Sequence, residues 1–223
     1  DPKALKGYQP VSIFKDANDF IWIGTQDEGL IKFNPSKGDL KMYKHDSENV
    51  NSLSHDSVLG VKSFMEKPQI LWIITDGGGL NLLDTQTDEI IRYQYLPENM
   101  LPNSISGNKL WGILQDKMGT VWIAEGGGVL NKFDPGSKKF RNLVHDPQNT
   151  NSLSQNQYIG KIIEDSTGII WIAASAGGLD SYDRETGQFE HFEHNPADLK
   201  SLPETICQAV YEDQSKKLWV STD

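Results

Sequence analysis

The sequence contains one cysteine, Cys207, among its 223 residues. A single thiol excludes an internal disulfide and any metal site built from several cysteines. No apolar run approaches the roughly 18 residues that mark a membrane-spanning helix. The first ten residues, DPKALKGYQP, also lack the pattern of a signal peptide. We therefore expect this segment to make no direct contact with a membrane.

Basic residues are scarce. Lysine and arginine together number 21 against 31 aspartates and glutamates, which gives a net charge of -10. A nucleic-acid backbone needs a basic surface, so nucleic acid is excluded as the main partner. The text also lacks GxSxG, HExxH, Walker A and EF-hand motifs. We expect no cofactor, no metal site and no catalytic residues.

Internal repetition is the informative feature that is present. Five segments centre on a tryptophan: FIWIGTQDEGLIKFN, ILWIITDGGGLNLLD, TVWIAEGGGVLNKFD, IIWIAASAGGLDSYD and KLWVSTD. These tryptophans are Trp22, Trp72, Trp122, Trp171 and Trp219, with separations of 50, 50, 49 and 48 residues. Such a constant period indicates a repeat architecture, with the tryptophans in the core between repeats.

Other positions keep the same register. An acid lies six residues before each tryptophan: Asp16, Glu66, Asp116, Asp165 and Asp213. A leucine lies eight residues after four of them: Leu30, Leu80, Leu130 and Leu179. The connections between repeats share the text NSLSHDSV, NSISGNKL, NSLSQNQY and KSLPETIC. We interpret the leucines as core and the acids as hairpin-turn residues, because aspartate bonds back to nearby backbone amides.

Each repeat holds four short apolar runs, which in the first repeat predict strands at about 11–15, 20–25, 30–34 and 39–44. Four antiparallel strands every 40–50 residues are typical of a β-propeller blade. The predicted fold is therefore all-β: four complete β-propeller blades and half of a fifth, a fragment of a larger propeller. The predicted segments are a lead-in at 1–10, blades at about 11–58, 59–108, 109–157 and 158–205, and a half blade at 206–223.

Three histidines, His45, His145 and His194, invite comparison with a metal or acid–base set. Each lies 23 residues after its own tryptophan, so each occupies the same place on a different blade. Equivalent places on neighbouring blades lie too far apart for one coordination sphere. We expect these histidines to have surface or strand-capping roles, and Cys207 to be a buried, unreactive thiol.

A single ligand site must come from places where the repeats differ. Eleven residues before the tryptophan, Trp111 stands among Val11, Val61, Gly160 and Gln208. Thirteen residues before it, Tyr158 stands among Gln9, Leu59, Lys109 and Ile206. Aromatic plates beside amides and hydroxyls are typical of sugar-binding surfaces. The predicted ligand-binding residues are Trp111, Tyr158, Asn108, Lys109, Gln157, Asn156, His55 and Asp56. The alternative is that Trp111 only fills the central channel of the propeller or packs against a neighbouring blade.

The recurring text resembles the two-component regulator propeller repeat, I-x-x-D-x-x-G-x-x-WIGT-x-x-GL-x-x-F/Y-D/N followed by NSLS. IFKDANDFIWIGTQDEGLIKFN, ILQDKMGTVWIAEGGGVLNKFD and IIEDSTGIIWIAASAGGLDSYD carry the resemblance. It implies a parent propeller of seven blades and the periplasmic sensor region of a hybrid two-component histidine kinase of the Bacteroidetes type. In that family the sensor responds to oligosaccharides and signals by phosphorelay. The expected partners are an oligosaccharide, the remaining blades and domains of the parent, and a second subunit in a homodimer.

Two other functions stay open at this point. Some propellers are lyases or glycosidases, and glycosidases need two carboxylates roughly 5–10 Å apart. No such pair can be recognised in the sequence, so we expect this segment to be non-enzymatic. A protein-interaction scaffold is the other alternative, and an exposed apolar or charged face would favour it.

Overall fold

The computed structural model describes residues 7–99, 103–154 and 158–223. The chain divides into two compact units, Asp1–Ile113 and Leu114–Asp223. Eighteen strands cover nearly half of the described residues, and the longest helical element among them is the single 3-10 turn η2 (Pro97–Asn99). No helix in those residues has the length and apolar character to cross a membrane. The predicted all-β class is confirmed.

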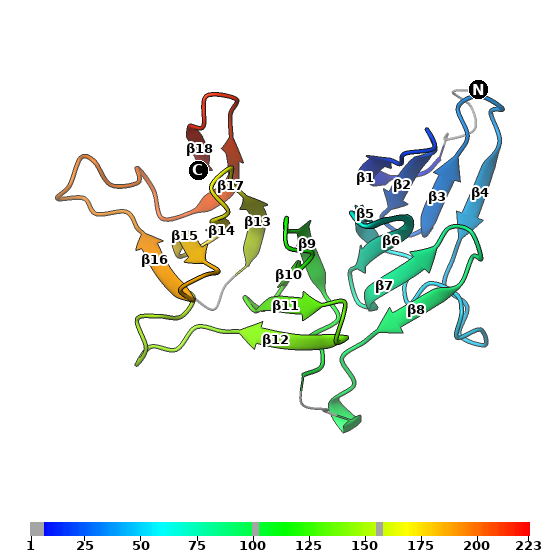
Figure 1. Cartoon of the computed structure of the whole chain (residues 1–223), viewed down its shortest axis with the longest axis horizontal. Helices are drawn as coiled ribbons and strands as arrows, with labels where there is room; N and C mark the ends of the chain where they lie inside the picture. Colours follow the sequence, from blue (N-terminus) through cyan, green and yellow to red (C-terminus); the bar gives the residue numbers. More distant parts are fainter. Residues whose placement is uncertain (1–6, 100–102, 155–157) are drawn as a thin grey trace. The chain divides into compact units, whose positions relative to one another are not determined.

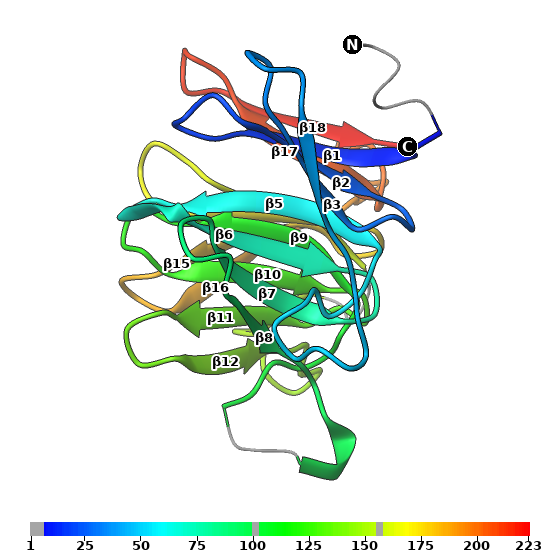
Figure 2. The ribbon, with the colours of Figure 1, turned by 90° about the vertical axis from the view of Figure 1, so that its right-hand side faces the viewer.

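The first unit contains two four-stranded antiparallel sheets with the strands in sequence order. Figure 2 shows β5 to β8 of the second sheet lying side by side. The elements of this unit are β1 (Pro10–Lys15), β2 (Ile21–Thr25), β3 (Leu30–Phe33), β4 (Leu40–Tyr43), β5 (Val58–Phe64), β6 (Lys67–Thr75), β7 (Gly79–Asp84) and β8 (Ile90–Tyr93). The strands predicted for the first repeat are confirmed to within one or two residues.

The later strands form two further four-stranded sheets and a two-stranded one (Figure 1). They are β9 (Leu110–Gln115), β10 (Val121–Glu125), β11 (Leu130–Asp134), β12 (Lys139–Leu143), β13 (Ile159–Glu164), β14 (Ile170–Ala174), β15 (Gly178–Asp183), β16 (Gln188–Phe192), β17 (Cys207–Glu212) and β18 (Leu218–Thr222). Four complete sheets and two strands of a fifth match the predicted series of blades, with β9 running across the boundary between the units.

A repeated aspartate builds the hairpin between the first two strands of a sheet. Asp16 Oδ1 accepts the backbone N–H groups of Asn18 and Phe20, and its Oδ2 accepts the indole N–H of Trp22 at 2.8 Å. The same indole bond recurs at the equivalent residues in three other repeats: Asp116 with Trp122, Asp165 with Trp171, and Asp213 with Trp219. The prediction that these acids serve turn chemistry is confirmed for these four.

The second sheet departs from this pattern, and one expected equivalence is wrong. In the first sheet the strand pairing ends at Lys15 and Ile21, and the next residue is Asp16. In the second sheet the equivalent pair is Ser63 and Leu71, and the next residue is Phe64. The hairpin around Glu66 is two residues longer, so Glu66 lies exposed in the turn. Phe64 meets the Trp72 indole edge to face, with ring centroids 6.0 Å apart. An aromatic contact is therefore present where the other sheets have a carboxylate.

The longer hairpin also changes which residues correspond at the start of the innermost strand. Val58 pairs with Thr75 as Pro10 pairs with Thr25, and in both strands the next residue is passed over by a β-bulge. The counterpart of Val11 is therefore Leu59, not Val61 as the spacing predicted. Trp111 is likewise the second residue of its strand.

The repeated tryptophans show how successive sheets share a core. Trp22 is fully buried in one cluster with Val58 and Val61 of the following sheet, and Trp122 is buried in the same way in the second unit. Trp171 faces the two-stranded sheet and is only partly buried. Trp219 is 62% exposed because no sheet follows it within these residues. The prediction of a core role is right for the inner sheets and wrong for Trp219.

Candidate functional site

The turn between β6 and β7 gathers several of the predicted ligand residues within the first unit. The N–H of Asp76 donates to the Ser57 carbonyl at 3.0 Å, and the N–H groups of Gly77 and Gly79 both donate to the Asn108 carbonyl at 2.9 Å. Asp76 also pairs with Lys109 in an isolated antiparallel bridge. Two connections, 55–57 and 107–109, are thereby held against one turn, which we call the rim turn (residues 76–79).

Glycine is required in the rim turn by space and by backbone conformation. Gly79 has φ +79°, and a Cβ there would lie 2.4 Å from the Tyr93 carbonyl oxygen. A Cβ on Gly78 would lie 2.4 Å from Ser54 Oγ. Such distances leave no room for any side chain. The glycine run is therefore explained by the close approach of neighbouring groups and by the positive φ of Gly77 and Gly79.

His55 lies exposed over the rim turn. Its Nδ1 accepts the N–H of Ser57 at 3.0 Å, so in the neutral ring the proton is on Nε2. A Cβ built on Gly77 would lie 3.2 Å from this Nε2, which places the ring directly above that glycine. In its neutral form His55 therefore presents a hydrogen-bond donor, Nε2–H, beside the rim turn.

Asp56 and Asn108 have scaffold roles that sequence reasoning missed. Asp56 Oδ1 accepts the N–H of His45 at 2.7 Å. In the next connection, Asn108 Oδ1 accepts the N–H of Tyr95 at 2.7 Å and its Nδ2 donates to the Tyr95 carbonyl at 2.9 Å. Each side chain thus binds the backbone of the residue that lies 23 positions after the tryptophan of the preceding repeat, His45 or Tyr95. The preference of Asp and Asn for such backbone bonds was the available signal.

The two aromatic departures lie in different units. Trp111 is on β9 and 41% exposed, and Tyr158 directly precedes β13 and is 50% exposed. The Tyr158 carbonyl accepts the N–H of Ser175, in the turn between β14 and β15. Tyr158 thus stands beside a turn of the same class as the rim turn. The predicted residues Asn156 and Gln157 lie outside the described residues.

The repeated histidines bind their own connections. Nδ1 of His45, His145 and His194 lies 2.7 Å from the carbonyl oxygen eight residues later, on Leu53, Leu153 and Leu202. Each histidine therefore has a structural role in holding its own connection, where a surface or strand-capping role was expected. Within the described ranges, no group of three or more His, Cys, Asp or Glu side chains is arranged to hold a metal ion. Cys207 is buried as expected, and burial raises the pKa of its thiol.

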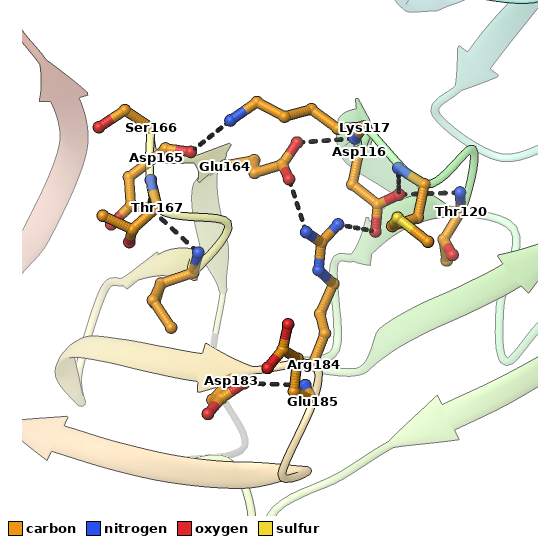
Figure 3. A network of polar contacts seen from close by, with 12 residues as sticks. Asp116, Lys117, Thr120, Glu164, Asp165, Ser166, Thr167, Asp183, Arg184 and Glu185 are labelled. Carbon is orange, nitrogen blue, oxygen red and sulfur yellow. Dashed lines mark hydrogen bonds and ion pairs between the residues drawn. The ribbon is translucent and has the colours of Figure 1, made fainter.

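A network of charges in the second unit brings two carboxylates together (Figure 3). Arg184 lies between Asp116 Oδ2, at 2.9 Å, and Glu164 Oε1, at 2.8 Å. Both acids are almost completely buried, and Glu164 also accepts the N–H of Lys117 at 2.7 Å. Asp116 is bonded to its hairpin and to Trp122 as well. These carboxylates are engaged in joining adjacent sheets, an arrangement unlike the free acid and base of a hydrolase.

Comparison with solved structures shows which folds this chain resembles. The extracellular domain of hybrid two-component system BT3049 from B. thetaiotaomicron aligns at TM-score 0.52 and 20% identity, over 97% of this chain and 33% of that one. The extracellular domain of one-component system BT4673 from the same organism aligns at TM-score 0.54 and 18% identity, over 96% and 33%. Virginiamycin B lyase from Staphylococcus aureus aligns at TM-score 0.69 and 15% identity, over 96% and 63%.

These likenesses establish a propeller-blade fold. The chain spans about a third of the length of the two extracellular domains and under two thirds of the lyase. No protein-family model matches the sequence, and a search of curated proteins finds no match. The structural neighbours therefore include extracellular sensor-system domains and an enzyme on one common architecture, and the fold does not choose between those functions.

Proposed function

We propose that this chain is part of the extracytoplasmic sensor region of a hybrid two-component signalling protein. The observation that carries the proposal is the repeat text, with its WIGT-type tryptophan and NSLS connection, on the fold found in the extracellular domains of BT3049 and BT4673. The segment itself is non-enzymatic in this proposal. It lies in the periplasm and passes ligand occupancy to a histidine kinase in a homodimeric parent.

The proposed ligand is an oligosaccharide bound at the rim. In the first unit Trp111 is an exposed aromatic residue at the start of an innermost strand, and His55 and Lys109 add polar groups beside the rim turn. In the second unit Tyr158 is an exposed aromatic residue before an innermost strand, beside the turn that holds Ser175. Sugar rings stack on aromatic faces while donors bond their hydroxyls. Asp56 and Asn108 belong to this site as residues that position the connections, because their side chains bind backbone.

The end faces of the series belong to the remaining blades of the parent in this proposal. Val11 and Ile13 of β1 are 48% and 76% exposed, and Tyr211 and Trp219 of the last sheet are each 62% exposed. In the first unit the equivalent face of β5 covers Trp22. Apolar surface of this kind is stabilised by a neighbouring blade.

Titration of the full-length sensor with a panel of oligosaccharides, by calorimetry, tests the proposal. A stacked aromatic side chain contributes about 1–2 kcal/mol, so Trp111→Ala should weaken binding ~5–30-fold. Its melting temperature should change little. Unchanged affinity with a large loss of stability would make Trp111 a packing residue, and absence of binding to every oligosaccharide would contradict the ligand class.

A propeller lyase is the second candidate function, because the lyase from Staphylococcus aureus shares the fold at TM-score 0.69. Turnover of a polysaccharide by the purified protein would favour the lyase, provided that substitution of a single acidic residue abolishes it. Asp27→Asn serves as the control for such a substitution and should leave any turnover unchanged, since Asp27 is an exposed acid of the β2–β3 turn.

A further inference from the structure

The connections between sheets are held by a pair of residues from the following sheet. In the first unit, Asn81 on β7 and Arg92 on β8 lie directly opposite each other in the ladder. Asn81 Oδ1 accepts the N–H of Ser54 at 2.9 Å. Arg92 donates to the carbonyl oxygens of Asn49, Ser52 and Leu53 at 2.8–3.0 Å. A permanently charged guanidinium therefore clamps the connection 49–54.

The second unit repeats this geometry with different chemistry. Asp180 on β15 and His191 on β16 are likewise opposite each other in the ladder. They lie 9 and 20 residues after Trp171, as Asn81 and Arg92 do after Trp72. Asp180 Oδ2 accepts the N–H of Ser154 at 3.0 Å, the same bond that Asn81 makes. The connection 149–154 is thus the counterpart of 49–54, and His191 takes the place of arginine.

Both ring nitrogens of His191 face atoms that only accept hydrogen bonds. Nδ1 lies 2.7 Å from Asp180 Oδ1, and Nε2 lies 2.9 Å from the Thr150 carbonyl oxygen. A neutral imidazole carries one N–H and can serve only one of these acceptors, whereas the imidazolium serves both. The Asp180 side chain is only 2% exposed, so it is a desolvated counter-ion for that cation.

We propose that Asp180 and His191 form a protonation-dependent clamp on the connection 149–154. With His191 protonated, the ring joins β15 and the Thr150 carbonyl. With His191 neutral, the ring keeps Asp180 through Nδ1–H, and its Nε2 lone pair then faces the carbonyl oxygen. The bond to Thr150 is lost and the connection is loosened at that residue, while Asn151 Oδ1 still accepts the N–H of Phe189 on β16 at 2.7 Å. The equivalent Arg92 clamp stays closed at every pH at which the protein folds.

The groups around His191 favour the closed clamp. Partial burial opposes the charged ring, but the bonds to Asp180 and Thr150 outweigh it and raise the pKa of His191 above its ordinary value. Glu193 acts in the same direction. Asp198 and Lys200 line the same hollow as His191. The clamp is fully formed below the ordinary histidine pKa of about 6.5 and opens as pH rises through the higher folded value.

His145 is a second titratable ring that binds this connection. Its Nδ1 lies 2.7 Å from the Leu153 carbonyl oxygen. A neutral ring donates from Nδ1 as well as a charged one does, so this bond does not require protonation. The pH response of the connection is therefore assigned to His191.

Hydrogen exchange and an NMR titration of this chain test the clamp. The His191 ring should titrate above 6.5, and protection of the amides at 150–154, corrected for intrinsic exchange, should fall on the order of five- to tenfold between pH 6 and pH 9. His191→Arg should remove that pH dependence. Asp180→Asn should lower the pKa of His191.

The reciprocal double variant Asn81→Asp/Arg92→His, which supplies both members of the pair, provides a matched control in the other unit. It should give the amides at 50–54 the pH dependence that 150–154 lose in His191→Arg. Equal protection of 150–154 at both pH values in the unmodified chain would overturn the proposal, as would a His191 pKa at or below 6.5. If His191→Arg does not fold, an unaltered pH response of 50–54 in Asn81→Asp/Arg92→His overturns it instead. None of these outcomes depends on a ligand or a kinase.

Discussion

The carboxylate of Asp116 binds both the buried Trp122 indole and the backbone of a surface turn. Its Oδ2 accepts the Trp122 indole N–H at 2.8 Å, and its Oδ1 accepts the N–H groups of Met118 and Thr120 at 3.0 and 2.9 Å. The side chain is fully buried and is also paired with Arg184. The residue therefore fixes the hairpin, the orientation of the indole and the position of a cation from the neighbouring sheet.

Asp116→Ala should destabilise the second unit by about 3–5 kcal/mol, because it leaves Arg184 and the hairpin amides without their acceptor. Asp213→Ala is the matched control. Asp213 makes the same indole bond to Trp219 on the solvent-exposed last sheet. The loss of stability in Asp213→Ala should be much smaller than in Asp116→Ala, and urea unfolding of the two variants measures the difference. Equal effects would mean that burial and Arg184 contribute nothing at Asp116.

Gly79→Ala separates a steric clash from backbone strain when it is compared with Gly38→Ala. Both glycines have positive φ, +79° and +74°. A Cβ at position 79 meets the Tyr93 carbonyl oxygen at 2.4 Å, whereas one at position 38 meets nothing within 4 Å. We expect about 1 kcal/mol of destabilisation for Gly38→Ala, from strain alone, and at least about 3 kcal/mol for Gly79→Ala. Similar melting temperatures for the two variants would contradict this.

The architecture could be predicted from sequence because its determinants are local and repeated. The tryptophan spacing and the hairpin aspartates each act within one sheet, so period and turn chemistry were sufficient. The longer hairpin around Glu66 escaped detection because the separations of Trp22, Trp72 and Trp122 are both 50 residues. The distance from the NS dipeptide to the tryptophan is longest in this repeat: 21 residues from Asn51 to Trp72, against 19 from Asn103 to Trp122 and 20 from Asn151 to Trp171.

The roles of the connections could not be predicted because they depend on contacts between repeats. Asn108 matched a sugar-binding residue by type, but its amide is bonded to Tyr95, 13 positions earlier in the chain. Arg92 and His191 occupy a position that also holds Met42 and Asn142, so periodicity assigns it no function. Only the fold places these side chains against the preceding connection.

Removal of a tryptophan should have an effect that depends on which sheet carries it. Trp22→Ala should cost about 3–5 kcal/mol, as expected for a buried aromatic side chain. Trp219→Ala should cost about 0.5 kcal/mol or less, because the side chain is largely exposed. Chemical denaturation compares the two losses, and acrylamide quenching of Trp219 fluorescence checks the exposure directly. A large loss for Trp219→Ala would show that another surface covers this residue in solution.

Asp213 provides a titration that reports on the indole bond itself. The hydrogen bond from Trp219 and those from Ser215 and the Lys217 N–H lower the pKa of Asp213 to about 2. A depressed carboxyl pKa stabilises the fold above the ordinary value of 3.8, and the effect is lost as pH falls through about 2. The carboxyl shift in an NMR titration should therefore have its midpoint near 2.

Trp219→Phe should move that midpoint up toward 3.8, because the largest cause of the depression is removed while an aromatic ring stays in place. Asp183 serves as the internal reference in the same titration. Hydrogen bonds from the Glu185 N–H and the Thr186 side chain lower its pKa without any tryptophan. The Asp183 midpoint should be the same in both proteins. An unchanged Asp213 midpoint in Trp219→Phe would show that the turn amides, and not the indole, hold the carboxylate in its charged form.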